Sequence, residues 1–435
     1  MRRRAAYMYG SRLPRDSQGH VGCGIGMAVS TGSNSLIPPN DSICQTGEER
    51  TIDGVRIIFQ MVPEAEAPSE MNFYFPNHRA LYIAECATHT LHNVITLRGA
   101  LVRDAKAWAK YLDESLVMFG EKSDVLFAGH HWPTWGEERI TRLLAEQHDL
   151  YAYLHDQTVR MMNLGLSGPE IAETLTLPPT LQRAWHAQGF YGSVSHNVKG
   201  IYQRYMGWFD GHPARLWELP PAENAKRYVD CMGGVEKVIH KAGVYTKDGD
   251  LRFAATLLSH AVAVDPRNVE ARETLAVVYE QLGFGAENAT WRNFYLSGAM
   301  DLRSGSKPST KLASDHKLRY TDSFEQWLGL LSVRLNGPQA ADESFIIDIK
   351  ITDEDRWWRV IVRNGALVYR TASSQSAFRG PAGLSFAGTK SQLHGILNGD
   401  AQLRNDMRSG DWSLLFKLLN LTGMSGASNI EPSHL

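Results

Sequence analysis

The sequence predicts a multi-domain protein of the α+β class. Its 435 residues exceed one typical domain and favour two or three. Hydrophobic residues make up 43% of the chain and charged residues 21%, so folded cores can form. The hydrophobic pattern also changes twice along the chain, from strand-like runs to a helical period and then to alternation. We therefore expect three domains, over residues 1–136, 137–300 and 312–430.

The first region combines short strands with one helix. Apolar residues recur at helical spacing over residues 105–119, which predicts a helix there. The run at 124–129 predicts a buried strand that ends at His130. Other apolar or alternating runs, each bounded by turn-forming residues, predict strands at 57–61, 71–75 and 79–84.

The second region follows a period of 3.6 residues. Apolar positions from Ile140 to Leu154 predict one long helix. Ser167, with proline in the first turn and Glu170 three residues on, is typical of a helix start with a capping box. Residues 253–264 and 269–282, separated by Asp-Pro, predict a helical hairpin. This region is therefore expected to be all helical.

The third region predicts a small α+β domain after a polar linker at residues 301–313. Apolar and polar residues alternate over 345–352, as in a half-buried strand. Asn364-Gly365 lies between two apolar runs and is a strong hairpin signal. A capped helix is expected to begin after Gly388.

Composition excludes several functional classes. Lysine and arginine (45) nearly balance aspartate and glutamate (47), which argues against nucleic-acid binding. There is no apolar run of about 18 residues, so we expect no transmembrane segment. The arginine-rich start lacks the apolar core of a signal peptide, and we expect this chain to be cytoplasmic. The four cysteines form no CxxC pair and are expected to be reduced, buried thiols.

Metal-competent side chains gather just beyond strand ends in the first region. Histidine and carboxylate are zinc ligands, and zinc-bound water is a nucleophile near neutral pH. Other interpretations remain open: the His-His pair could cap a strand, the other histidines could pack in the core, and the loop glutamate could be solvated. The residues concerned are Glu66, Glu85, His89, His92, His130 and His131.

Longer stretches resemble the alkyl sulfatases, which are sulfuric-ester hydrolases of the metallo-β-lactamase superfamily. The resemblance covers essentially the whole chain. It rests on RRAAYMYG at 3–10, APSEMNFYFP at 67–76, AECATHTLHN at 84–93, TLRGA at 96–100, HHWP at 130–133, GSVSHN at 192–197 and YQRYMGW at 202–208.

The resemblance implies an architecture and a partner. Residues 1–136 would be the C-terminal part of an αββα sandwich of the metallo-β-lactamase type. Residues 137–300 would form a helical domain through which two chains make a homodimer. Residues 312–430 would resemble sterol carrier protein 2.

The resemblance also implies a site. Glu66, Glu85 and His130 would be ligands of a two-zinc centre. Arg98 and Asn93 would hold the sulfate group, a task that suits the planar donors of arginine.

Two residues of the helical region would approach the ester, namely His196 and Tyr205. A core histidine and a core tyrosine are equally open interpretations of these two residues.

The implied reaction is hydrolysis of alkyl sulfates such as dodecyl sulfate to alcohol and sulfate by zinc-bound hydroxide. The family's His-x-His-x-Asp-His motif is absent from these 435 residues, which leaves three donors at most for two metal ions. We therefore expect an N-terminally truncated member of the family. The alternative is a catalytically inactive homologue that dimerises and binds lipid, and a fragment with no stable fold is a third possibility.

Overall fold

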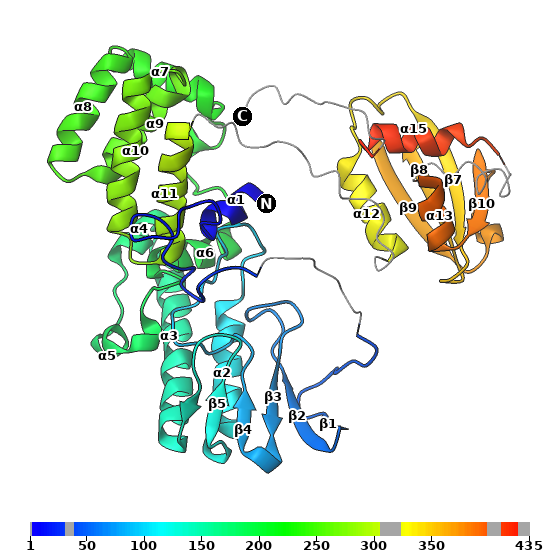
Figure 1. Cartoon of the computed structure of the whole chain (residues 1–435), viewed down its shortest axis with the longest axis horizontal. Coiled ribbons are helices and arrows are strands. Elements are labelled where there is room, and N and C mark those ends of the chain that lie inside the picture. The colour runs from blue at the N-terminus through cyan, green and yellow to red at the C-terminus, as the bar shows by residue number, and fades with distance from the viewer. Residues whose placement is uncertain (1, 31–38, 305–322, 398–409, 425–435) are drawn as a thin grey trace. The chain divides into compact units, whose positions relative to one another are not determined.

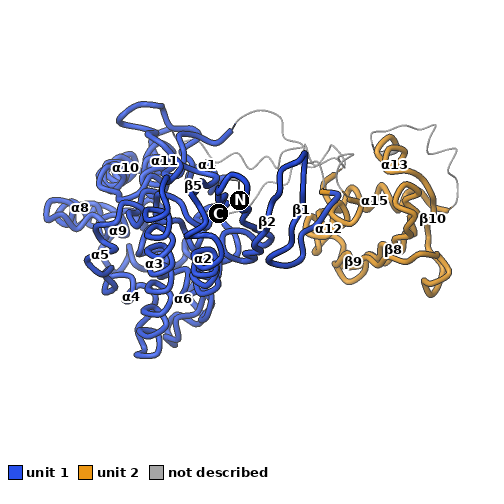
Figure 2. Tube along the Cα trace, turned by 90° about the horizontal axis from the view of Figure 1, so that it is seen from below, with its two compact units in different colours: residues 1–32, 40–308 blue, residues 33–39, 309–435 orange. Residues whose placement is uncertain are grey.

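The computed structural model describes residues 2–30, 39–304, 323–397 and 410–424. The chain divides into two compact units, Met1–Gly32 with Asn40–Pro308 and Ser33–Pro39 with Ser309–Leu435 (Figure 2). Each unit has a sheet and helices of its own, so the predicted multi-domain α+β class is confirmed. No helix within the described ranges is long and apolar enough to cross a bilayer.

The sheet of the first unit has six strands that lie side by side in chain order (Figure 1). Neighbouring strands are antiparallel except β4 and β5, which are parallel and joined through helix α2 (Ala105–Phe119). A parallel pair needs such a crossover. The strands are β1 (Glu49–Ile52), β2 (Val55–Met61), β3 (Met71–Phe75), β4 (Ala80–Tyr82), β5 (Val125–Phe127) and β6 (Thr134–Trp135).

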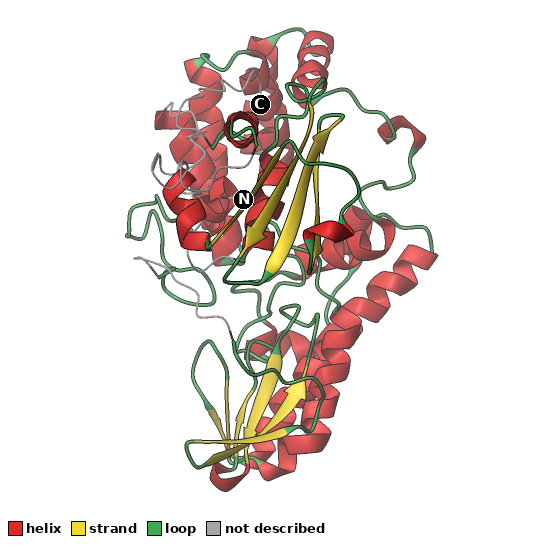
Figure 3. Ribbon diagram, turned by 90° about the vertical axis from the view of Figure 1, so that its right-hand side faces the viewer, coloured by secondary structure: helices red, strands yellow, loops and turns green. Residues whose placement is uncertain are grey.

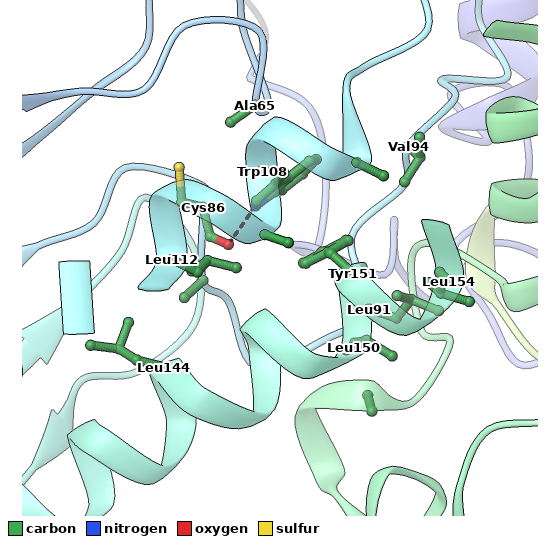
Figure 4. Packing of buried hydrophobic residues seen from close by; sticks show 14 of the residues in the cluster. Ala65, Cys86, Leu91, Val94, Trp108, Leu112, Leu144, Leu150, Tyr151 and Leu154 are labelled. Atoms are coloured by element: carbon green, nitrogen blue, oxygen red, sulfur yellow. Dashed lines mark hydrogen bonds between the residues drawn. The ribbon is translucent and has the colours of Figure 1, made fainter. Parts of the chain in front are cut away.

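One face of this sheet packs on α2. Asn72 of β3 donates to Ser115 of α2 over 3.3 Å, and the ring of Tyr74 stacks on Phe119. Helix α2 then packs on α3 (Glu137–Asn163) through a core that includes Trp108, whose indole N–H donates to the Cys86 carbonyl over 2.8 Å (Figure 4). The predicted helix at 105–119 is therefore confirmed.

The opposite face of the sheet carries a row of aromatic rings, one from each of four neighbouring strands. Phe59, Phe73, Tyr82 and Phe127 follow one another with ring centroids 5.3 to 5.4 Å apart. Phe127 is exposed on this face. The prediction of a buried strand at 124–129 is therefore wrong in part. Leu126 is buried on the α2 side of the sheet, whereas Phe127, on the opposite side, is exposed.

Helices make up the rest of the first unit. Ser167 forms the predicted capping box, and Asp265 separates the two helices of the predicted hairpin. Helix α1 (Arg2–Met8) packs on α11, where Asn293 donates to the Met8 carbonyl over 3.1 Å. The remaining helices are α4 (Gly168–Thr174), α5 (Pro179–Arg183), α6 (Val194–Met206), α7 (Pro221–Cys231), α8 (Val235–Lys247), α9 (Leu251–Val264), α10 (Val269–Phe284) and α11 (Ala289–Ser304).

Two expectations from the sequence need correction. Residues 301–304 are the last turn of α11 rather than linker, because the helix continues along α10; the rest of 301–313 lies outside the described residues. All four cysteines are free, but Cys44 and Cys231 are exposed rather than buried. Free thiols need no cover when they lie on loops or helix ends.

The second unit has a four-stranded sheet in the order β10-β7-β8-β9 (Figure 1). Figure 3 draws the strands of both sheets in yellow and the helices in red. The Asn364-Gly365 turn joins β8 and β9 as predicted. Asp348 and Arg359 form a buried, bidentate ion pair of 2.7 and 2.8 Å between neighbouring strands. The elements are α12 (Phe324–Arg334), β7 (Ser344–Ile351), β8 (Arg356–Arg363), β9 (Ala366–Ala372), β10 (Leu384–Gly388), α13 (Lys390–Leu397) and α15 (Ser413–Leu421).

Candidate metal and sulfate site

The site lies on loops beyond β2, β4 and β5, and Glu70 ties the first two of these loops together. The Glu70 carboxylate accepts backbone N–H groups of Glu66 over 2.8 Å, Ala67 over 3.4 Å and Glu85 over 2.9 Å. Burial raises the pKa of Glu70, although these N–H donors oppose that shift. Because one side chain holds both loops, Glu66 and Glu85 are fixed relative to each other.

Glu85 lies between two imidazoles. Its carboxylate oxygens are 2.9 Å from Nε2 of His92 and 3.2 Å from Nε2 of His130. Burial alone would raise the pKa of Glu85, but hydrogen bonds from His130 and His92 outweigh it and hold that pKa well below its usual range. Ala84 and His131, next to this contact, have φ angles of 47° and 68°. Such backbone strain is often concentrated at functional sites.

Three side chains present donor atoms close enough to share one metal ion. Single atoms of Glu66, Glu85 and His92 all lie within 4.8 Å of one another. Carboxylate oxygen and imidazole nitrogen are zinc ligands, so this donor set fits zinc. His130 joins the group through Glu85. The structure therefore brings Glu66 and Glu85 together with His92, while the third predicted ligand, His130, contacts only Glu85 among them.

Arg103 holds this cluster through hydrogen bonds to Glu66 and Asn93. Its guanidinium donates to the Glu66 carboxylate and to the Glu66 carbonyl, the latter over 2.6 Å. It also donates to the Asn93 side chain and, over 2.6 Å, to the Asn93 carbonyl. Burial lowers the pKa of Arg103 to about 10, which still leaves it charged at neutral pH. Arg103 therefore neutralises Glu66 and fixes Asn93.

The two predicted sulfate residues lie on either side of a pair of tyrosines. Arg98 donates through Nε to the Tyr9 hydroxyl over 3.2 Å. Burial and the nearby Tyr9 raise the pKa of Tyr191, and Asn93 opposes that shift. The edge of the Tyr191 ring meets the His92 ring at a centroid distance of 5.0 Å. Arg98 thus contacts the first tyrosine, and His92 contacts the second.

His196 and Tyr205, both on α6, have different surroundings. His196 is buried, and its Nδ1 accepts from the Trp291 indole over 3.0 Å. Its Nε2 has no hydrogen-bond partner among the described residues. Burial lowers the pKa of His196 to about 3, so the ring is neutral at pH 7 and carries its proton on Nε2. The next residue, Asn197, donates to the His92 carbonyl over 2.9 Å, so this turn of α6 lies beside the loop that carries His92.

Tyr205 contacts a different group. Its hydroxyl is 2.7 Å from Nε2 of His155, whose Nδ1 is 2.7 Å from Asp156. Among the contacts of the described residues, none joins Tyr205 to Glu85 or its imidazoles. The catalytic role expected for Tyr205 remains a prediction.

The resemblance implied no role for three residues that build the cluster, Glu70, Arg103 and His92, although His92 is among the metal-competent residues of the first region. His89 and His92 lie in a loop, where a spacing of three residues does not show whether two side chains point the same way. Glu70 and Arg103 act through hydrogen bonds between loops. Of these three residues, His92 lies in the motif AECATHTLHN at 84–93, one of the stretches that carry the family resemblance.

Known proteins resemble this chain over most of its length. Two family models match, alkyl sulfatase dimerisation over residues 167–305 and alkyl sulfatase C-terminal over residues 314–421. A linear primary-alkylsulfatase of Pseudomonas is 32% identical over 99% of this chain and 82% of its own length. The chain belongs to the alkylsulfatase family. A second Pseudomonas linear primary-alkylsulfatase is 41% identical over 94% of the chain, and the alkyl/aryl-sulfatase BDS1 of Saccharomyces cerevisiae is 44% identical over 85%.

A solved alkylsulfatase has the same fold. The stereoselective inverting sec-alkylsulfatase Pisa1 from Pseudomonas sp. superimposes with a TM-score of 0.90 at 36% identity, over 96% of this chain and 67% of that one. The chain spans 60% of the length of the 41% identical relative and 57% of the length of the yeast relative.

Proposed function

We propose that the chain contributes metal donors and sulfate-binding residues to a zinc-dependent alkylsulfatase. The reaction is hydrolysis of an alkyl sulfate such as dodecyl sulfate to an alcohol and sulfate. The working form is a homodimer formed through the helical region, in line with the dimerisation model matched at residues 167–305.

The observation that carries the proposal is the position of Glu85. Its carboxylate lies between His92 and His130, and a donor atom of Glu66 lies within 4.8 Å of donor atoms of Glu85 and His92. These residues would hold zinc. When bound, zinc supplies Lewis acidity and activates water for attack on the ester.

The surrounding residues suit a sulfate ester. Arg98 commits donors to Tyr9 and to the Gly99 carbonyl, which leaves N–H groups of its guanidinium for sulfate oxygens. The Nε2–H of neutral His196 is a second donor without a partner among the described residues. Asn93 is buried and held by Arg103.

The test is release of inorganic sulfate from dodecyl sulfate by the purified chain with added zinc. Release should stop on addition of a chelator. Replacing Arg98 by alanine removes a charged hydrogen-bond donor and should lower kcat/KM by about 10- to 100-fold. The matched control, Arg183→Ala, changes an exposed arginine of α5 and should leave the rate unchanged. Sulfate release that survives the chelator would contradict the proposal.

One observation favours a second function. The 435 residues contain no His-x-His-x-Asp-His sequence, so the donors present are fewer than two zinc ions need. A catalytically inactive homologue that dimerises and binds lipid would bind dodecyl sulfate without releasing sulfate. Equilibrium dialysis with dodecyl sulfate, run beside the sulfate assay, separates the two functions.

A further inference from the structure

A cavity of about 840 Å³ lies in the helical part of the first unit, between α1 and the helices α9, α10 and α11. Cavities of about 300–1,000 Å³ with mostly apolar walls and a few polar groups are the usual binding sites for small molecules. None of the lining residues belongs to the loops around Glu85. We infer that this cavity binds a single-chain anionic amphiphile, that is, an alkyl chain that ends in a carboxylate or a sulfate.

The walls of the cavity are apolar and come from helices that pack on one another. Helix α10 contacts both α9 and α11, and α1 packs on α11 (Figure 1). An alkyl chain that leaves water for such a wall gains free energy with each methylene group that it buries. The apolar and aromatic lining residues are Val262, Ala263, Pro266, Leu275, Tyr279 and Leu302.

Three arginines, Arg3, Arg267 and Arg272, line the same cavity. The Arg3 guanidinium lies 5.5 Å from the centroid of the Tyr7 ring, and Nε of Arg272 donates to the Leu302 carbonyl over 2.7 Å. Among the ion pairs of the described residues, none joins any of the three arginines to a carboxylate. Their positive charges are therefore available to an anion.

Asp301 carries the one carboxylate among the described residues that line the cavity, and it already has partners. Its oxygens accept the Tyr7 hydroxyl over 2.5 Å and pair with Arg12 over 2.7 Å. Three arginines against one aspartate leave the lining positively charged. A carboxylate or sulfate group gains charge-assisted hydrogen bonds from arginine, whose planar donors can reach two oxygens at once.

The combination of apolar walls and unpaired arginines distinguishes between classes of ligand. A small inorganic anion would use the arginines but leave the apolar walls in contact with water. A neutral alkyl compound would cover the walls and leave the arginines without a counter-charge. An anionic amphiphile satisfies both parts of the cavity, because its chain covers the walls and its head pairs with the arginines.

The experiment measures binding of dodecanoate to the whole chain by equilibrium dialysis, below the critical micelle concentration and with a chelator present. Arg267→Glu reverses a lining charge, and Ala263→Trp places a large ring in the cavity; both positions are exposed, so the fold should persist. The matched controls are Arg183→Glu on α5 and Ala222→Trp on α7, which are exposed and lie outside the cavity. We expect the controls to bind as wild type does, and each cavity variant to lose at least about 10-fold in affinity.

Two further ligands with the same alkyl chain test the head group. Dodecyl sulfate replaces the carboxylate by a sulfate, and the tighter of the two ligands identifies the preferred anion. Dodecyl maltoside has a neutral head and should bind at least about 10-fold more weakly than either.

Equal affinity of wild type and both cavity variants for the anionic ligands would overturn the inference, and so would equally tight binding of dodecyl maltoside. Because metal is chelated throughout, the outcome does not depend on whether the chain releases sulfate. The inference and the proposed alkylsulfatase function can therefore fail separately.

Discussion

The loops around Glu85 and the tryptophan segment, residues 205–219 with the exposed Trp208 and Trp217, present their side chains in opposite ways. Around Glu85, each polar group is buried and held by another part of the chain, as Glu70 and Arg103 hold Glu66. In the tryptophan segment the backbone is held locally, while the largest side chains contact solvent. Fixed polar groups suit a ligand that needs defined geometry, whereas the large apolar side chains of residues 205–219 remain uncovered within one chain.

The largest expected effect comes from removing the positive charge of Arg103, which pairs with Glu66. Arg103→Met leaves the Glu66 carboxylate buried without its partner, and this should cost about 3–5 kcal/mol of unfolding free energy. Urea denaturation measures the loss. The control, Arg142→Met, breaks an exposed ion pair on α3 and should cost less than about 0.5 kcal/mol. Equal losses in the two variants would show that the cluster is no more tightly held than the surface.

A second effect concerns pH. The pKa of His196 is lowered to about 3 in the folded chain, against about 6.5 for an unfolded histidine. The unfolded state therefore binds the extra proton first, and stability falls as pH drops from about 6.5 towards 3, by about 1.4 kcal/mol per pH unit. His196→Gln should remove this part of the slope in denaturation curves at several pH values. The same slope in His196→Gln as in wild type would contradict the buried, neutral state.

A smaller effect is expected at Glu70. Its two oxygens accept three backbone N–H groups, and glutamine offers only one oxygen, so Glu70→Gln turns an amide donor towards an N–H. We expect a loss of about 1–3 kcal/mol in unfolding free energy. Zinc affinity should also fall by about 10- to 100-fold, because the loops that carry Glu66 and Glu85 lose their common support. Unchanged zinc affinity would remove Glu70 from the site's supporting residues.

The smallest effect belongs to the tryptophan segment. At dilutions where the chain is monomeric, Trp217→Ser should change unfolding free energy by less than about 0.5 kcal/mol, because a 95% exposed side chain packs on little. Urea denaturation at low concentration measures it. A loss above about 2 kcal/mol would mean that the Trp217 ring is packed within one chain. The contrast with the buried groups around Glu85 would then be wrong.

Periodicity predicted most of the fold. The helix at 105–119, the hairpin at Asn364-Gly365 and the capping box at Ser167 depend on residues close in sequence, and all three are present. The end of α11 at Ser304 was missed because tertiary packing extends a helix into a polar stretch.

The candidate site was predicted only through resemblance. Glu66, Glu85 and His130 come from three loops, and no spacing rule relates them. His92 was a candidate by residue type alone, and its contact with Glu85 could not be predicted because it depends on how the loop after β4 turns back. Long-range hydrogen bonds of this kind leave no local pattern in a sequence.

The central claim is that Glu66, Glu85 and His92 hold a metal ion. Its most direct test is zinc affinity, measured by competition with a chromogenic chelator, for wild type, Glu85→Ala, His92→Ala and the control His240→Ala on the exposed face of α8. We expect wild type and His240→Ala to bind zinc equally, while Glu85→Ala and His92→Ala each lose at least about 100-fold in affinity. Equal zinc affinity in all four proteins would contradict it.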